Sequence, residues 1–422
     1  MLIWKSPKTG RLTGGPFYFE FLGGFLLQRK TISQGRLLLK RMNSLQISPA
    51  VKRFRFVGIL TVVAVYLLIL VGGIVRSTGS GMGCPDWPKC FGQWIPPTEA
   101  SQLPADYKEV YTAQRVAKNQ KLARTLEKLG FAQVAGSIFA HPTQYIETDF
   151  NPVKTWIEYL NRLLGALIGV LVFLTVVFAL PYWHRDRSIF WLAFGSFLLT
   201  GVQGYLGSLV VSTNLLPVMV TIHMALALVI VAMLLYAVDR AQWRVEQLNL
   251  AATQGSPATS RLANGKNPSA GLQWSLWGAL LLTFLQIILG TQVREQVDIV
   301  SNAAAGLGRE TWVAKLGTAF SVHRTVSAVV LLLNVYVCYE LRQLARPRLS
   351  RLATLTLSIV GLEILAGIIL AYFALPAAVQ PVHLTLATVL FGVQFIALLA
   401  VARARKTPET IASTNAPGRV VA

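Results

Sequence analysis

Two histidines lie inside apolar runs in the C-terminal part of the chain. His323 occurs in FSVHRTVSAVVLLLNVYV and His383 in LPAAVQPVHLTLATVLF. An ionisable group in such a run is costly and is by default a functional candidate. Two imidazoles from neighbouring helices can hold an iron from opposite faces, as in bis-histidine haem sites of helical bundles. The alternative is that each histidine is a core residue with a hydrogen bond across a helix interface.

An earlier part of the chain repeats both runs. EYLNRLLGALIGVLVFL aligns Asn161 with His323, and LPVMVTIHMALALVIV aligns His223 with His383. The paired positions are 62 residues apart in the first copy and 60 in the second. GGIVRSTGS resembles LGTQVREQV in the same way. Repetition at nearly constant spacing favours a ligand role for these histidines over unrelated core positions.

The first copy differs from the second at two positions. It has Asn161 in place of His323 and Glu158 in place of Phe320. A haem in the first copy would have His223 as its one strong ligand, which leaves an iron face open to oxygen. The second copy has a full ligand pair, which suits electron transfer. The sequence therefore predicts two sites with different tasks.

Glu158, Asn161 and Arg162 share one helical face, because they occupy positions i, i+3 and i+4. A desolvated carboxyl group within reach of a porphyrin could move protons or stabilise a developing cation. The alternative is that Glu158 forms an ion pair with Arg162 that fixes the helix.

Three further arginines belong to the candidate sites. Arg324 and Arg294 are predicted at the outer end of the second copy, where a guanidinium can pair with haem propionates. Arg76 is the counterpart of Arg294 in the first copy and is assigned to the first site. The alternative for Arg324 and Arg294 is that their side chains extend to the lipid headgroups.

Cys84 and Cys90 lie in GCPDWPKCFG, just after the first apolar run. Their spacing allows a disulfide if the loop faces an oxidising compartment. The small stiff loop between them could shape the mouth of the first site or exchange electrons with a thiol partner, and zinc binding is disfavoured because no two further ligands lie nearby. The third cysteine, Cys338, lies inside an apolar run.

The composition indicates which elements position these residues. Of the 422 residues, 54% are hydrophobic and 14% are charged, and the mean hydropathy is +0.53, which excludes an ordinary soluble domain. We predict an all-α membrane protein with about eight transmembrane helices, arranged as two pseudo-symmetric four-helix bundles. The apolar runs lie near 55–75, 156–180, 189–211, 217–238, 274–291, 321–340, 352–374 and 382–402.

The charge of the chain is unevenly distributed. The chain has 39 Lys and Arg against 18 Asp and Glu, which indicates contact with the negative lipid leaflet rather than with nucleic acid. The connections 212–218 and 374–381 carry no charge. By the positive-inside bias, the basic segments and both termini are cytoplasmic. The basic segments are 52–55, 184–187, 239–272, 342–351 and 403–406.

These patterns divide the chain into five parts. A basic leader (1–53) is either a presequence or an over-long start before Met42. The long outer loop is predicted to contain an amphipathic helix from Asp106 to Phe131 that lies on the membrane surface. The remaining parts are a first unit (54–238, with outer loop 76–155), a linker (239–272), a second unit (273–402) and a tail (403–422).

The residues from 54 to 402 resemble the haem A synthase family. The resemblance rests on GGIVRSTGSGMGCPDWPKC, on WIEYLNRLLG, and on the histidines at 223, 323 and 383, in this order. It implies an integral membrane enzyme that oxidises the C8 methyl group of haem O to a formyl group by successive hydroxylations. The product, haem A, would serve terminal oxidases.

The resemblance also implies roles for individual residues. His323 and His383 would hold a haem b, and His223 would hold the substrate haem O in the first unit. Glu158 matches the catalytic acid of the family, and Cys84 and Cys90 match its loop disulfide.

Asn161 departs from the family pattern, which has histidine at this position. One explanation is a branch of the family in which a single axial histidine suffices. The other is a paralogue that has lost or changed the activity.

The remaining expectations concern partners and location. Haem O synthase and an electron donor (a ferredoxin, a quinol or a thiol) are expected partners, together with membrane lipid. The expected location is a bacterial cytoplasmic membrane, with the mitochondrial inner membrane as the alternative. Two other functions stay open: a membrane b-haem electron carrier with a degenerate first site, and a transporter built from a duplicated bundle.

Overall fold

The computed structural model describes residues 49–139, 146–147, 149–252, 266–304 and 306–406. Within these residues the chain forms ten α-helices and no β-strand. The leader up to residue 48, including Met42, lies outside the described residues. So do the centre of the linker and the end of the tail.

Eight of the described helices are long and apolar enough to cross a membrane. Each contains one of the apolar runs found in the sequence, so the prediction of an all-α membrane protein is confirmed. The helices are α2 (Pro49–Ser77), α5 (Pro152–Ala179), α6 (Arg187–Ser212), α7 (Pro217–Ala252), α9 (Ala270–Ala303), α10 (Thr318–Gln343), α11 (Pro347–Tyr372) and α12 (Val379–Lys406).

Side-chain caps mark the beginning of two of these helices. Asn151 precedes α5, and its side chain accepts a hydrogen bond of 3.1 Å from the Lys154 amide, with Pro152 as the first helical residue. Ser269 caps α9 in the same way, because its hydroxyl accepts a 3.0 Å hydrogen bond from the Leu272 amide. The Asn151 cap fixes where α5, which carries Glu158, begins.

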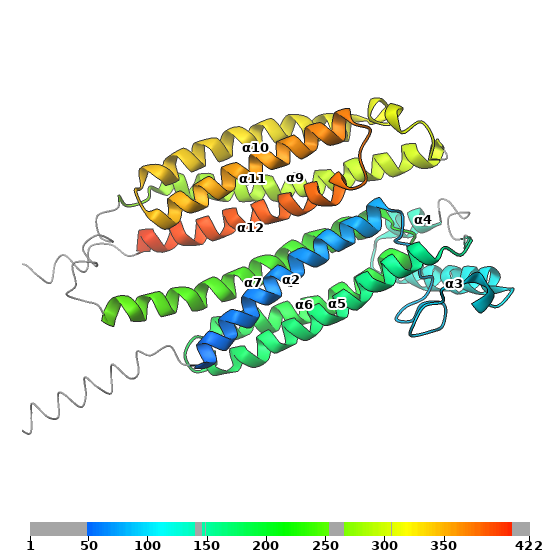
Figure 1. Cartoon of the computed structure of the whole chain (residues 1–422), viewed down its shortest axis with the longest axis horizontal. Helices are drawn as coiled ribbons and strands as arrows, with labels where there is room; N and C mark the ends of the chain where they lie inside the picture. The colour runs from blue at the N-terminus through cyan, green and yellow to red at the C-terminus, as the bar shows by residue number, and fades with distance from the viewer. Residues whose placement is uncertain (1–48, 140–145, 148, 253–265, 305, 407–422) are drawn as a thin grey trace, which may run out of the picture.

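The eight helices form two groups of four, as Figure 1 shows. In the first unit, α2 contacts α5 and α7, and α6 lies between α5 and α7. In the second unit, α9 contacts α10 and α12, and α11 lies between α10 and α12. Neighbours therefore follow the same order in both units. The pseudo-symmetric relation between the units, and the domain boundaries, stay predictions.

The two units pack closely through α12, which contacts α2 and α7, and through the contact of α7 with α9. A Cβ atom added at Gly73 would lie 2.8 Å from the Pro381 Cβ, so only glycine fits this crossing. The hydroxyls of Thr221 and Thr291 form a 2.8 Å hydrogen bond between α7 and α9. Small and hydroxylated residues thus bring the two units together.

Two buried aspartates form ion pairs with four arginines at one end of the bundle. Asp186 accepts hydrogen bonds from Arg240 (2.7 Å) and Arg244 (3.0 Å). Asp239 forms ion pairs with arginines of α11 and α12, namely Arg348 (2.7 Å) and Arg403 (2.5 Å). This is the end that the charge distribution predicts to be cytoplasmic, and the orientation stays a prediction.

The long loop of the first unit contains the predicted helix. It is α3 (Tyr107–Lys128), followed by the short α4 (Ala132–Ile138). Asn119 of α3 donates a 2.7 Å hydrogen bond to the carbonyl of Ser212 at the end of α6. The loop therefore covers the end of the first unit opposite the basic connections (Figure 1). Contact of α3 with the membrane surface stays a prediction.

Candidate functional site

Cys84 and Cys90 form a disulfide, which confirms the pairing expected from their spacing. Inside the loop that it closes, the Asp86 carboxylate accepts hydrogen bonds from the amides of Phe91 (2.6 Å) and Gly92 (2.9 Å). The loop is thus ordered by a covalent bond and by an acidic side chain at its centre. We refer to residues 83–92 as the disulfide loop.

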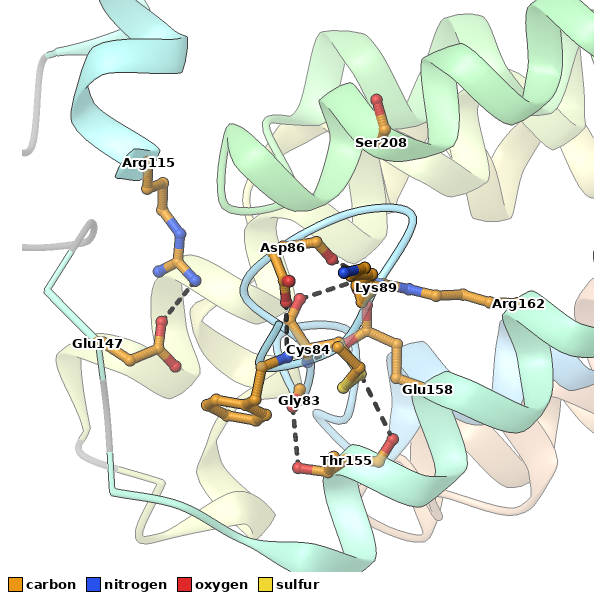
Figure 2. A network of polar contacts seen from close by, with 12 residues as sticks. Gly83, Cys84, Asp86, Lys89, Arg115, Glu147, Thr155, Glu158, Arg162 and Ser208 are labelled. Atoms are coloured by element: carbon orange, nitrogen blue, oxygen red, sulfur yellow. Dashed lines mark hydrogen bonds and ion pairs between the residues drawn. A yellow bond between two sulfur atoms is a disulfide. The ribbon is translucent and has the colours of Figure 1, made fainter. Parts of the chain in front are cut away.

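Arg162 and Glu158 attach the disulfide loop to α5 (Figure 2). The Arg162 guanidinium donates to the carbonyl oxygens of Asp86 (2.6 Å), Cys84 (3.0 Å) and Lys89 (3.1 Å). The Glu158 carboxylate accepts a 2.8 Å hydrogen bond from the Cys84 amide. Both side chains therefore belong to the contact between the loop and the helix.

Glu158 and Arg162 also form the ion pair that was one of the two alternatives from the sequence. The Glu158 residue is only 2% exposed, and each of its carboxylate oxygens has a donor, Arg162 on one and the Cys84 amide on the other. A buried charge needs such partners to be tolerated. The pair holds the carboxylate in one orientation, which a structural and a catalytic role both require.

His223 lies on α7 and faces α6. The Gln203 side chain donates a 2.8 Å hydrogen bond to the backbone carbonyl of His223, not to its ring. Among the described residues, the buried ring nitrogen Nδ1 of His223 has no hydrogen-bond partner. The Cε1 atom lies 3.8 Å from where a Cβ would stand on Gly207. The ring is therefore free to bind a ligand.

The first unit contains further unpartnered polar atoms. The buried atoms Asn161 Oδ1 and Trp156 Nε1 have no hydrogen-bond partner among the described residues. A Cβ at Gly72 of α2 would meet no atom within 4 Å. Buried polar atoms are normally paired, so the unpaired Asn161 Oδ1 is consistent with its predicted place at a site. The first unit has such atoms on both α5 and α7.

His323 and His383 face each other between α10 and α12, as the sequence predicts. Their ring centroids are 6.4 Å apart and the ring planes are inclined by 74°. With metal–imidazole bonds of about 2 Å, two rings that share one metal ion have centroids roughly 6 Å apart. The separation of the two rings is therefore compatible with one iron between them.

Glycines leave room beside each of the two rings. A Cβ at Gly290 would lie 3.6 Å from His323 Cε1, and one at Gly367 would lie 3.6 Å from His383 Cε1. Both distances are ordinary van der Waals contacts, so each glycine lies directly beside the Cε1 edge of a ring. Gly290 and Gly72 each precede an aligned arginine by four residues, so the two glycines correspond. A Cβ at Gly290 would contact the His323 ring, whereas one at Gly72 would meet no atom within 4 Å.

Glu363 of α11 is a site residue that the sequence reasoning missed. Its Oε2 atom lies 2.6 Å from His383 Nδ1, although the N–H direction is not aligned as in a full hydrogen bond. The signal in the sequence was an acidic residue in the middle of the apolar run LTLSIVGLEILAGI. Carboxylates beside a ligand histidine commonly orient the ring.

Arg76 and Arg294 share one carboxylate, that of Asp298. Arg76 of α2 and Arg294 of α9 each form a 2.7 Å ion pair with it. Arg294 also donates a 2.5 Å hydrogen bond to Gln380 of α12. Asp298 was not identified from the sequence. Contacts of these arginines with a haem stay predictions, and Arg76 keeps two nitrogens without a partner among the described residues.

Arg324 takes no part in this cluster. Its guanidinium lies over the Phe320 ring, 5.8 Å from the ring centroid, on an exposed face of α10. Its role at a propionate stays a prediction.

A second ion pair, Arg115 with Glu147, stabilises the outer loop. The two side chains are 2% and 4% exposed, and the distance between Nη2 and Oε2 is 2.7 Å. Burial raises the pKa of Glu147, while Arg115 opposes the rise. The pair joins α3 to the segment before α5 (Figure 2), and no spacing rule in the sequence indicates it.

The structure therefore brings the predicted residues together in three groups. One contains Glu158, Arg162 and the disulfide loop, and one contains Arg76 and Arg294. The third contains His323 and His383. Among the described residues, no hydrogen bond joins Glu158 to His223.

Comparison with known proteins places this arrangement in a family. A family model described as cytochrome oxidase assembly protein, COX15-CtaA, matches residues 55–129 and 131–395. The match begins in α2 and ends in α12, so it includes all three groups.

Individual relatives are more distant. A haem A synthase of Rhodospirillum centenum is 28% identical over 290 residues, which cover 66% of this chain and 65% of that protein. A haem A synthase of Bradyrhizobium sp. strain BTAi1 is 28% identical over 267 residues, covering 60% and 58%. The match spans less than two thirds of the length of both relatives.

A third relative matches over a longer stretch. A haem A synthase of Roseobacter denitrificans is 23% identical over 366 residues, which cover 78% of this chain and 82% of that protein. These relatives are bacterial, and with the eight apolar helices they indicate a bacterial multi-pass membrane protein. Because the family model covers both four-helix units, this chain belongs to the COX15-CtaA family of cytochrome oxidase assembly proteins.

Proposed function

We propose that this protein is a haem A synthase, which oxidises the C8 methyl group of haem O to a formyl group by successive hydroxylations. The observation that carries the proposal is the imidazole pair of His323 and His383, with centroids 6.4 Å apart, in a family of oxidase assembly proteins. Three bacterial relatives with the name haem A synthase support it.

The second unit would hold a resident haem b through His323 and His383. Bound there, haem b supplies one-electron transfer. Arg324 and Arg294 are proposed to neutralise its propionates, since a guanidinium can offer paired hydrogen bonds to a carboxylate. Arg294 lies at the end of α9 that is also the end of the histidine pair, which supports this role.

The first unit would bind the substrate haem O. His223 is proposed as the axial ligand, because its ring nitrogen is buried and unpartnered. Asn161 offers a weaker donor on α5, and Arg76 offers unpartnered guanidinium nitrogens at the end of α2. Arg162 is proposed to act at this site through Glu158 and the disulfide loop, to which its own donors are committed. A substrate must leave after reaction, and a single strong ligand permits that better than two.

Glu158 is proposed as the catalytic carboxylate at the methyl group. Arg162 and the Cys84 amide hold it in one orientation inside its buried site. A fixed carboxylate stabilises positive charge that develops on the substrate, or accepts a proton from the carbon being oxidised. The disulfide loop fixes its position and therefore belongs to the active site.

The charge distribution supports an orientation in the membrane. The basic connections and both termini are proposed to face the cytoplasm, which places the disulfide loop and both haem sites near the outer face of a bacterial cytoplasmic membrane. Haem O synthase is the proposed source of substrate. A ferredoxin, a quinol or a thiol is the proposed electron donor.

The test is to purify the full chain from cells that co-produce haem O. Haems are extracted in acid–acetone and separated by chromatography, and a reduced-minus-oxidised spectrum is recorded beside them. We expect haem A or its hydroxylated intermediate together with haem B. The His383→Ala variant should lose the low-spin b-type spectrum, because it removes one axial ligand.

Two outcomes would contradict the proposal. Haem B alone, despite available haem O, would instead favour a membrane electron carrier with a degenerate first site. A low-spin b-type spectrum that persists in both His323→Ala and His383→Ala would refute the ligand assignment.

A further inference from the structure

Glu363, which contacts His383, has an aligned counterpart in the first unit. The two side chains differ in their chemistry. Gln203 precedes His223 by 20 residues, and Glu363 precedes His383 by 20 residues. The aligned positions thus hold an amide in the first unit and a carboxylate in the second.

The two residues contact different parts of their histidines. Gln203 donates to the backbone carbonyl of His223 at 2.8 Å, and the His223 ring nitrogen Nδ1 has no partner among the described residues. Glu363 reaches the ring itself, with 2.6 Å between Oε2 and Nδ1 of His383, although the N–H direction is not aligned as in a full hydrogen bond. The carboxylate therefore lies beside the imidazole that faces His323, whereas the amide contacts the backbone of its histidine.

A carboxylate in this place has a known physical effect on a metal ligand. When Nδ1–H donates to a carboxylate, the other nitrogen, Nε2, carries the lone pair and is the one that binds metal. The hydrogen bond also makes the imidazole a stronger donor, which stabilises the oxidised metal more than the reduced metal. Both effects act on the ligand without direct contact between the carboxylate and the metal.

We propose that Glu363 is the positioning residue of the second-unit haem site: it accepts the Nδ1–H of His383, directs Nε2 to the iron and lowers the reduction potential of the haem. The inference rests on the proposed function, because it requires a haem b between His323 and His383. It extends that function, because it gives the axial histidines of the two units different donor strengths. His223, with no carboxylate on its ring, remains the weaker donor.

The burial of both groups supports a specific role over general packing. The Glu363 and His383 side chains are 12% and 26% exposed. Glu363 lies in the middle of an apolar helix, where an ionisable side chain without a functional partner is energetically unfavourable. Glutamine has nearly the same size and also has an acceptor oxygen. Glutamate differs from it in its negative charge, which makes the hydrogen bond from Nδ1–H stronger.

The experiment compares the full-length Glu363→Gln variant with the wild type, both purified with their haem. Potentiometric titration of the low-spin haem gives the midpoint potential, and electron paramagnetic resonance reports the axial ligand field. Removing the carboxylate should lower, by about tenfold, the ratio of the affinity for oxidised haem to the affinity for reduced haem. For a one-electron couple this raises the midpoint potential by about 59 mV.

Two further variants make the result specific. Glu363→Asp keeps the carboxylate and should retain a potential between those of the wild type and Glu363→Gln. Glu340→Gln removes the same charge from the far end of α10, about 25 Å along the helix from His323, and should leave the potential unchanged.

The outcomes separate this inference from the proposed function. A wild-type protein without low-spin haem B would refute the haem assignment itself. A wild-type spectrum with an unchanged potential and resonance signal in Glu363→Gln would overturn the role of Glu363 alone. Equal loss of haem from Glu363→Gln and Glu363→Asp would assign Glu363 to packing, and would also overturn it.

Discussion

The two four-helix units share one order of helix neighbours but differ in the polar residues inside them. In the second unit, His323 and His383 face each other, and Glu363 contacts the ring of His383. In the first unit, Asn161 occupies the aligned position of one histidine, and the Gln203 side chain donates to the backbone of His223. Under the proposed function, one shorter side chain and one neutral side chain distinguish the substrate site from the resident haem site.

The disulfide loop marks a second difference. The loop packs on α5 through Glu158 and Arg162. In the second unit, Phe320 aligns with Glu158, and its ring lies against Arg324. The described residues of the first unit therefore hold a buried carboxylate under the disulfide loop, and the aligned position of the second unit is apolar. Under the proposed function, this carboxylate belongs to the unit that performs the oxidation.

The largest effect is expected from Glu158→Gln. Loss of the carboxylate should lower the rate of haem A formation by about 10²- to 10⁴-fold, because its charge and its proton acceptor are both lost. The haem B content should stay the same, since the second unit is unchanged. Chromatography of extracted haems measures both. Glu340→Gln is the control, and an unchanged yield of haem A in Glu158→Gln would remove the catalytic role.

The disulfide is expected to matter next. The Cys84→Ser and Cys90→Ser double variant should lower product formation by up to about 100-fold, because the loop that orients Glu158 loses its covalent closure. Three hydrogen bonds from Arg162 remain, so the protein should still fold. Haem analysis of membranes from matched cultures is the measurement. Cys338→Ser serves as the control, and equal activity in both variants would make the disulfide dispensable.

Asn161→His should make the first unit resemble the second. A second histidine would saturate the substrate iron, so we expect a low-spin spectrum for bound haem O and at least about tenfold less product. Asn161→Gln, which adds bulk without a strong ligand, is the matched control. If Asn161→His raises the yield of haem A, the single-histidine interpretation of the first site is wrong.

The smallest effect concerns the glycines. Gly290→Ala should change haem b binding by no more than about twofold, because the added Cβ would lie in ordinary van der Waals contact, 3.6 Å from His323 Cε1. Gly72→Ala, at the aligned position where a Cβ would meet no atom within 4 Å, should leave haem B content unchanged. Retention of haem B after dilution in detergent compares the two. A large loss of haem B from Gly290→Ala would show that the space beside the His323 ring is tighter than this contact.

Much of this architecture could be predicted from the sequence, because apolar runs of membrane-spanning length define the helices. The histidine pair could be predicted because the chain repeats its own pattern, and the pairing of Cys84 with Cys90 because the two are close in sequence. For Glu158 the sequence offered an ion pair and a catalytic role, and the ion pair is present.

The remaining contacts depend on how helices distant in sequence cross. Asp298 of α9 pairs with Arg76 of α2, which is 222 residues away in the sequence. Arg115 and Glu147 come together only in the folded outer loop. Neither pair has a spacing signal. Glu363 could have been found, because it is an acid in an apolar run and aligns with Gln203, but its contact with the ring required the structure.

The ion pairs between the units have a mechanical consequence. At one end of the bundle, Asp298 of the second unit binds Arg76 of the first. At the other end, Asp239 of α7 binds Arg348 of α11 and Arg403 of α12. Ion pairs therefore join the two groups of helices at both ends, and a rocking motion of one group against the other would break an ion pair in either direction. Alternating-access transport depends on such rocking, whereas electron transfer between two sites benefits from a separation that does not vary.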